Sequence, residues 1–111
     1  MDRNRLNRNF DVIFMKTFQE IREILTENKE KIQGTYKVKK LGIFGSYVRG
    51  EQREDSDVDV LVTFEEPVSL LKLVNFENYL QDMTGTKMDV VPEKSIRPEL
   101  RDIILDEVIY I

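Results

Sequence analysis

Two aspartates of this 111-residue chain, Asp57 and Asp59, alternate with Val58, Val60 and Val62. Side chains alternate along a strand, so both carboxylates would lie on one face, with Cα atoms about 6–7 Å apart. Carboxylates placed this way repel unless a cation lies between them, and they suit Mg²⁺ ions held roughly 3.5–4 Å apart in a two-metal transfer site. The pair therefore indicates a metal site. The alternative is the solvent-exposed acidic start of a strand.

A third aspartate, Asp89, lies inside the apolar segment Met88-Asp89-Val90-Val91. Burying an unpaired carboxylate is costly, so its charge needs a partner if this segment is a buried strand. A metal shared with Asp57 and Asp59 would compensate it. An ion pair with a nearby lysine or arginine, or an exposed position on an edge strand, would also explain it.

Gly45-Ser46 lies between an apolar segment and a short polar one, where a strand would turn into helix. Glycine lets the backbone approach a ligand closely, and amide groups at the start of a helical turn favour phosphate oxygens. The Ser46 hydroxyl would add a further donor. The alternative is purely structural, with Gly45 as a turn residue and Ser46 as a helix N-cap.

The composition excludes several kinds of catalytic and binding site. Cys and His are both absent, which excludes thiol nucleophiles, disulfides, zinc fingers, histidine bases and Ser-His-Asp triads. The net charge is −4, and seven of the 21 acidic residues lie between residues 51 and 66, so we expect no large basic surface for nucleic acid. The first residues lack the apolar run of a signal peptide or membrane span, and we expect a cytoplasmic protein that binds no membrane.

The surrounding pattern predicts the elements that position these residues. Apolar spacings of three and four predict an amphipathic helix over residues 10–31, ended by Gly34. We expect strands over residues 36–44, 57–64 and 87–91, the last stopped by Pro92. A single helical turn is expected over 47–51, with Ser46 as its N-cap and Gly50 near its C-terminus.

Two more helices complete the expected set. One begins after Pro67 and Ser69 and ends at Gly85, with an apolar stripe formed by Leu70, Leu73, Val74, Phe76, Leu80 and Met83. The other covers residues 98–107, with Leu100, Ile103 and Ile104 inward. We expect one α/β (α+β) domain over residues 1–111, with about three strands in a small mixed sheet flanked by helices. Residues 1–34 would form an N-terminal helical segment and 35–111 a catalytic core. The pattern does not determine the order or direction of the strands.

Gly45-Ser46, ten intervening residues, Asp57-x-Asp59 and the later Asp89 together resemble the pattern of the DNA polymerase beta superfamily of nucleotidyltransferases. More narrowly, the stretch GSYVRGEQREDSDVDVLV resembles the minimal nucleotidyltransferases, the MNT or MntA-like antitoxins that pair with HEPN-domain toxins. The tail IRPELRDIILDEVIYI is similar to the closing helix of that family. The resemblance implies a polymerase-beta-like nucleotidyltransferase fold.

The resemblance also implies roles for individual residues. Gly45 and Ser46 would hold the β- and γ-phosphates of a nucleoside triphosphate, and Arg49 and Arg53 could neutralise the charge of those phosphates. Asp57 and Asp59 would ligate both Mg²⁺ ions. Asp89 would complete the site of the metal that activates the attacking hydroxyl, and it stands where a general base is needed. For Arg53, pairing with Glu51 or Glu54 is an equally open alternative, and the loop 51–55 has no assigned role.

In the family that the chain resembles, AMP passes from ATP to a tyrosine of the partner HEPN toxin, which silences that RNase. The resemblance therefore implies an adenylyltransferase with ATP and a HEPN toxin as partners. Two alternatives remain. The chain could neutralise a toxin by complex formation alone, through its acidic cluster. It could instead modify a small hydroxylated compound, although a chain of 111 residues leaves no second domain to form such a pocket.

Overall fold

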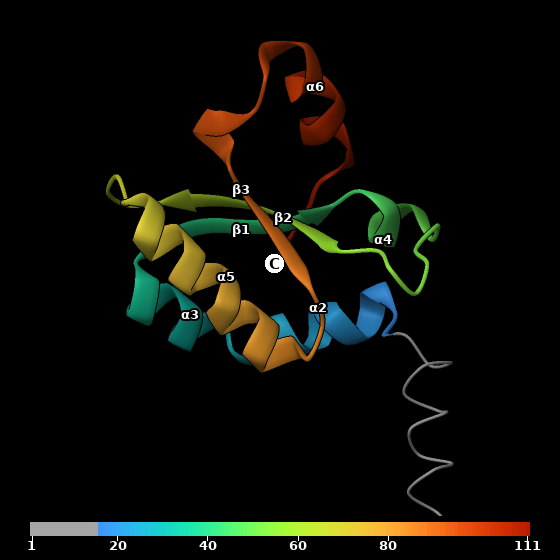
Figure 1. Ribbon diagram of the computed structural model, residues 1–111, viewed down its shortest axis with the longest axis horizontal. Helices are drawn as coiled ribbons and strands as arrows, with labels where there is room; N and C mark the ends of the chain where they lie inside the picture. Colours follow the sequence, from blue (N-terminus) through green and yellow to red (C-terminus); the bar gives the residue numbers. More distant parts are fainter. Residues whose placement is uncertain (1–15) are drawn as a thin grey trace, which may run out of the picture.

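A four-stranded mixed sheet forms the centre of the molecule in the computed structural model, which describes residues 16–111 (Figure 1). The strands are β1 (Val38–Phe44), β2 (Val58–Phe64), β3 (Met88–Pro92) and β4 (Ile109–Tyr110), in the spatial order β3-β2-β1-β4. β1 pairs antiparallel with β2 and with β4, whereas β2 and β3 run parallel. The expected fold class, a small mixed sheet flanked by helices, is confirmed.

The sheet has four strands rather than about three, because the last residues form an edge strand. β4 pairs with β1 at only two positions, Gly42 with Tyr110 and Ile43 with Ile109. A two-residue strand is too short to show an alternating pattern. The three expected strands are present, although β1 begins at Val38 rather than residue 36, and β3 includes Pro92 as its last residue.

The N-terminal helix differs from its prediction in the described residues, while its part over residues 10–15 lies outside them. α2 (Phe18–Glu27) begins at a capping box in which Thr17 and Glu20 each bond the other's backbone N–H. It ends at Asn28, whose backbone N–H and side-chain amide both donate to the Ile24 carbonyl. α3 (Lys29–Tyr36) then runs through Gly34, so the prediction that Gly34 ends a single helix was wrong.

α5 (Leu70–Thr84) is the crossover between the parallel strands β2 and β3. Ser69 caps its first turn, and Gly85 ends it in the left-handed region at φ 69°, as expected. The helix contacts the core through the row Leu73, Phe76, Leu80 and Thr84. Leu70 and Val74 lie off this row and remain exposed, so the predicted stripe was wrong at these two positions.

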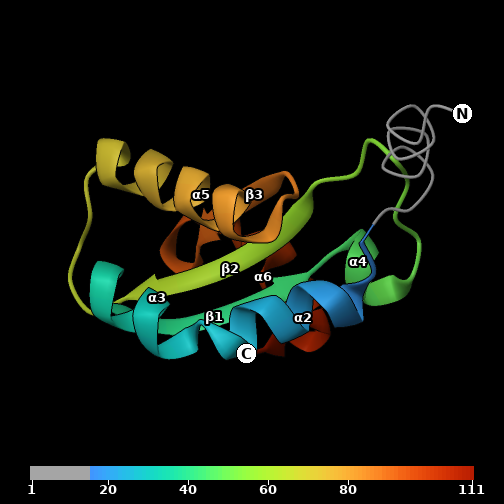
Figure 2. The same ribbon diagram turned by 90° about the horizontal axis from the view of Figure 1, so that it is seen from below.

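The helices cover the two faces of the sheet unequally. α2, α3 and α5 lie together on one face, and α6 (Pro98–Glu107) lies on the other, after the short helix η1 (Glu93–Ser95) (Figures 1 and 2). α6 contains no buried residue, and Leu100 and Ile103 are exposed. The expectation that these two face inward was therefore wrong, because this single helix has no second helix beside it to bury them.

The main hydrophobic core lies between the sheet and the three-helix layer. Tyr36 and Phe64 pack edgewise on the fully buried Phe76, with ring centroids 5.0 and 5.3 Å apart. The other fully buried large apolar side chains of this core are Ile21, Leu25, Ile32, Ile43, Val58, Val60, Val62 and Leu80, whereas Leu61 is buried on the opposite face of the sheet. Within residues 16–111, no helix is long and apolar enough to cross a membrane.

Candidate active site

The three aspartates singled out in the sequence come together around one end of β2. Asp59 pairs in register with Asp89 on the parallel neighbour β3, and Asp57 lies just before β2. Val58, Val60 and Val62 are buried toward the three-helix layer, so alternation turns Asp59 to the opposite face, where α6 lies. β2 and its pairing begin at Val58, so the prediction that Asp57 shares this face with Asp59 stays a prediction.

Gly45 lies directly against Asp59. It follows β1, whose last residue Phe44 is the register partner of Asp59, and it has φ 82° and ψ −153°. A Cβ atom at this position would overlap the Asp59 carboxylate, besides forcing an L-residue into a disfavoured conformation. Glycine is therefore required both for the turn and for the close approach of the carboxylate.

Burial and electrostatic repulsion together mark Asp59 as the centre of this acidic group. Burial first, and then the charges of Asp89 and Asp57, raise the pKa of Asp59 from 3.8 to about 6. Arg49 opposes this shift, whereas Glu107 adds to it. Repulsion of this kind favours either a proton or a cation at the site.

The Gly-Ser turn leads into one helical turn, α4 (Ser46–Arg49), and Gly50 ends it in the left-handed region. Its N-cap is Gly45 rather than Ser46, so the predicted cap was wrong by one residue. No side-chain cap bond forms at this end of α4, because the N-cap residue is a glycine. The Ser46 hydroxyl therefore does not cap α4, and the purely structural alternative for this residue does not apply.

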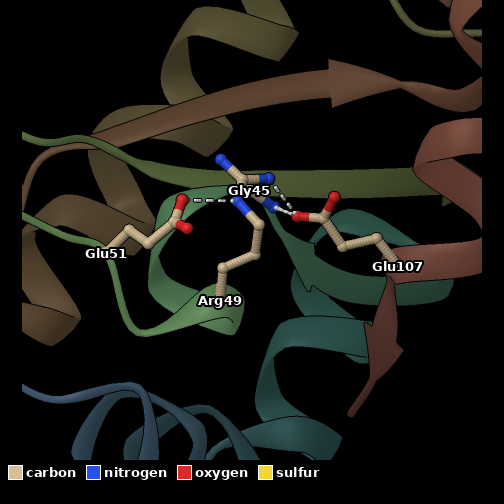
Figure 3. Close-up of polar contacts among 4 residues, drawn as sticks. All are labelled: Gly45, Arg49, Glu51 and Glu107. Atoms are coloured by element: carbon tan, nitrogen blue, oxygen red, sulfur yellow. Dashed lines mark hydrogen bonds and ion pairs between the residues drawn. The ribbon is translucent and has the colours of Figure 1, made fainter.

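Sequence reasoning missed Glu107, the last residue of α6 (Figure 3). Its Oε1 accepts a hydrogen bond of 2.6 Å from the Gly45 backbone N–H and one of 2.7 Å from Arg49 Nη1. Arg49 also donates through Nε to Glu51, at 2.8 Å. Glu107 lies 62 residues from Gly45 in the chain, and no local pattern points to such a distant partner.

The predicted phosphate-binding residues are therefore adjacent, but Arg49 is already paired with two carboxylates. Glu51, from the loop left without a role, pairs with Arg49 through the guanidinium Nε. Arg53 donates its backbone N–H to Ser56 Oγ and makes no ion pair within the part of the chain that the structure describes. The alternative pairing of Arg53 with Glu51 or Glu54 is therefore not formed in this structure, and its role toward phosphate stays a prediction.

The donor set suits a hard divalent cation, since all the candidate ligands are carboxylate oxygens. Asp59 and Asp89 are register partners. The Asp59 carboxylate occupies the space that a side chain at position 45 would need, and this space is open because residue 45 is a glycine. In the conformation described for residues 16–111, no three acidic side chains converge closely enough to ligate one ion together. To bind one ion together, these carboxylates would therefore have to rotate toward it. Asp89 is exposed, so its side chain has room to rotate.

Comparison with known proteins agrees with this geometry. Residues 21–111 match the family described as nucleotidyltransferase domain, and the chain belongs to this family. It is 49% identical over 98 residues to a Methanocaldococcus jannaschii protein provisionally named protein adenylyltransferase MJ1217, covering 87% of this chain and 100% of that one. Protein adenylyltransferase MntA of Thermococcus cleftensis is 45% identical over 97 residues, covering 87% and 98% of the two chains.

Solved structures show the same fold. A structure provisionally described as a minimal nucleotidyltransferase superimposes with a TM-score of 0.64 at 37% identity, covering 78% of this chain and 92% of that chain. The fold also recurs in a complex of a tri-AMPylated Shewanella oneidensis HEPN toxin with an MNT antitoxin, with a TM-score of 0.58 at 20% identity, covering 78% and 68%. The family expected from the Gly-Ser and Asp-x-Asp pattern is confirmed.

Proposed function

We propose that this nucleotidyltransferase transfers AMP from ATP to a tyrosine hydroxyl of a partner HEPN toxin and thereby silences the toxin. The similarity to proteins named adenylyltransferases over nearly their whole length supports a protein acceptor. A HEPN partner is supported by the shared fold with the MNT antitoxin complex. We place the reaction in the cytoplasm, with no nucleic acid or membrane as a partner.

The observation that carries the proposal is the paired position of Asp59 and Asp89 beside Gly45. Together with Asp57, these residues would hold two Mg²⁺ ions. When bound, the ions would activate the attacking hydroxyl and offset negative charge on the phosphates. Because repulsion from Asp89 and Asp57 helps to raise the pKa of Asp59, cation binding would relieve a repulsion that the fold has built in.

In the transfer, the tyrosine oxygen forms a bond to the α-phosphorus of ATP. The bond from that phosphorus to the oxygen leading to the β-phosphorus breaks, and pyrophosphate leaves with the electron pair. The tyrosine proton passes to Asp89, which is exposed and next to Asp59, or to water. Gly45 and Ser46 would bind the β- and γ-phosphates, and Arg49 would balance the charge of the leaving group.

Label transfer tests this proposal directly. ATP labelled at the α-phosphorus should transfer its label to a HEPN-domain protein encoded beside this one, whereas ATP labelled at the γ-phosphorus should not. Mass spectrometry of the labelled peptide should place AMP on tyrosine. We expect the double variant Asp57→Asn, Asp59→Asn to lose transfer by at least about 100-fold, because two of the carboxylates that would hold the metal ions are removed.

Glu54→Gln with Asp55→Asn is the matched control, since it removes the same charge from exposed residues of the same segment. Full transfer by the Asp57, Asp59 variant would refute the assigned site. If that variant transfers nothing but still protects cells from the toxin, the chain acts by complex formation. Label found on a small hydroxylated compound instead of a protein would identify a different acceptor.

A further inference from the structure

One carboxylate oxygen already occupies the two donors that lie at either end of the proposed phosphate turn. Glu107 Oε1 accepts from the Gly45 N–H at 2.6 Å and from Arg49 Nη1 at 2.7 Å (Figure 3). A carboxylate oxygen and a phosphate oxygen are acceptors of the same kind, and charge-assisted bonds of this length are strong. The same donors cannot fully serve both anions at once.

The two carboxylates on Arg49 are not equivalent. The Glu107 side chain is 18% exposed, whereas that of Glu51 is 65% exposed. Glu51 pairs with Arg49 Nε, and because the Glu51 side chain is largely exposed, solvent weakens the interaction. Glu107 is more shielded, and it alone also binds the backbone N–H of Gly45. It is therefore the stronger obstacle to an incoming phosphate.

Glu107 also lies next to the acidic centre of the site. Gly45, which binds Glu107 through its N–H, also lies so close to Asp59 that a Cβ atom on it would overlap the Asp59 carboxylate. A nucleotide that kept Glu107 in place would add its own negative charge beside both carboxylates. Exchange of one anion for the other avoids this accumulation of charge.

α6 is held loosely enough to permit that exchange. No residue of this helix is buried, and Leu100 and Ile103 are exposed. Apart from the bonds of Glu107, the side chains of this described helix make one ion pair, of 3.0 Å, between Arg101 and Glu93. The Arg101 side chain is 45% exposed. Rotation of the Glu107 side chain, or a small shift of α6, would free Gly45 and Arg49.

We propose that Glu107 is an internal competitor of the nucleotide's phosphates, so that ATP must displace it from Gly45 and Arg49 before the site can fill. This inference rests on the proposed function, because it takes the Gly45 turn to be the phosphate site. Glu107 restrains ATP binding in the isolated protein. An interaction that draws α6 away from the sheet would strengthen ATP binding.

Calorimetric titration with ATP and with inorganic triphosphate, each with Mg²⁺, tests the competition. The variants are Glu107→Gln and Glu107→Ala, and thermal melts confirm that each is folded. Both should bind triphosphate about tenfold more tightly than wild type, because a charge-assisted competitor is removed. Asp106→Asn is the control, since it removes the same charge from the exposed neighbouring residue and should change affinity by less than about twofold.

Equal or weaker binding by both Glu107 variants would overturn the inference and make Glu107 a residue that positions Arg49. If neither wild type nor any variant binds ATP or triphosphate, the proposed function itself fails. The amide resonance of Gly45 supplies a second readout in wild-type protein. It should move on adding inorganic triphosphate to the position expected for a phosphate partner, and its failure to move while triphosphate binds would also refute displacement.

Discussion

Asp59 of β2 and Asp89 of β3 are direct register partners on parallel strands, so two carboxylates lie side by side on one face of the sheet. Hydrogen bonding between the strands fixes this distance, and the repulsion cannot be relieved by moving the backbone apart. It can be relieved by a cation, by a proton, or by replacing one carboxylate. Each of these three routes leads to a measurable effect.

Adding Mg²⁺ should stabilise the wild-type protein. At about ten times its dissociation constant, a cation that binds only the folded state contributes about 1.4 kcal/mol, which raises the melting temperature by several degrees. Thermal melts with Mg²⁺ and with EDTA measure this shift. The Asp57→Asn, Asp59→Asn variant should not respond, and NaCl at the same ionic strength controls for screening. An equal response in that variant would place the metal elsewhere.

The contribution of Asp59 to the stability of the metal-free protein should fall as pH rises from about 4 to about 7. The pKa of Asp59 is raised to about 6 in the folded protein, against an ordinary value of 3.8. Between these values the folded state binds more protons than the unfolded state, so deprotonation favours unfolding. Asp59 is only half deprotonated near pH 6, so the loss is complete at about pH 7.

Urea denaturation of wild type and Asp59→Asn in EDTA, at several pH values, isolates this contribution. The asparagine variant should gain stability over wild type as pH rises through the window, and Asp55→Asn should show no such gain. A constant difference between Asp59→Asn and wild type across the window would contradict the role assigned to Asp59.

Gly45→Ala should abolish transfer and destabilise the fold by about 2 kcal/mol, because alanine is strained at positive φ and its Cβ overlaps Asp59. Gly34→Ala is the matched control. Gly34 lies within α3 with open space around its Cα, so alanine there should stabilise by about 0.5–1 kcal/mol. Chemical denaturation and the label-transfer assay give the two readouts. Wild-type activity in Gly45→Ala would show that the close contact is dispensable.

Phe76→Ala should lower the free energy of unfolding by about 3–5 kcal/mol, because this fully buried ring packs against both Tyr36 and Phe64. Leu71 belongs to the same helix but is 71% exposed, and Leu71→Ala should change stability by less than about 0.5 kcal/mol. Urea denaturation of both variants makes the comparison. Similar costs would mean that the exposed end of α5 is covered in solution.

The elements that depend on local pattern could be predicted from the sequence. In β2, Asp59 alternates with buried valines, and α5 is capped by Ser69 at its start and by Gly85 at its end. The N-terminal helix was mispredicted because Asn28, rather than Gly34, supplies the interruption. A glycine inside a helix costs only about 1 kcal/mol, and neighbouring contacts can offset that.

The candidate site could be predicted only in part, because only some of its residues are related by local sequence spacing. Asp57, Asp59 and Gly45 are recognisable from short-range spacing, whereas the pairing of Asp59 with Asp89 depends on a strand order that the pattern does not determine. Glu107 could not be predicted, because its contact with Gly45 depends on how α6 returns to the sheet. The exposure of Leu100 likewise depends on the number of helices on that face.

The parallel pairing of β2 and β3 also limits how the length of this chain can vary. A residue inserted near Gly85, in the turn before β3, can be absorbed without moving the strand. A residue inserted between Met88 and Asp89 would shift the pairing by one position and turn the carboxylate to the opposite face. Homologous chains should therefore gain and lose residues in the turns around α5 and keep the length of β3 constant.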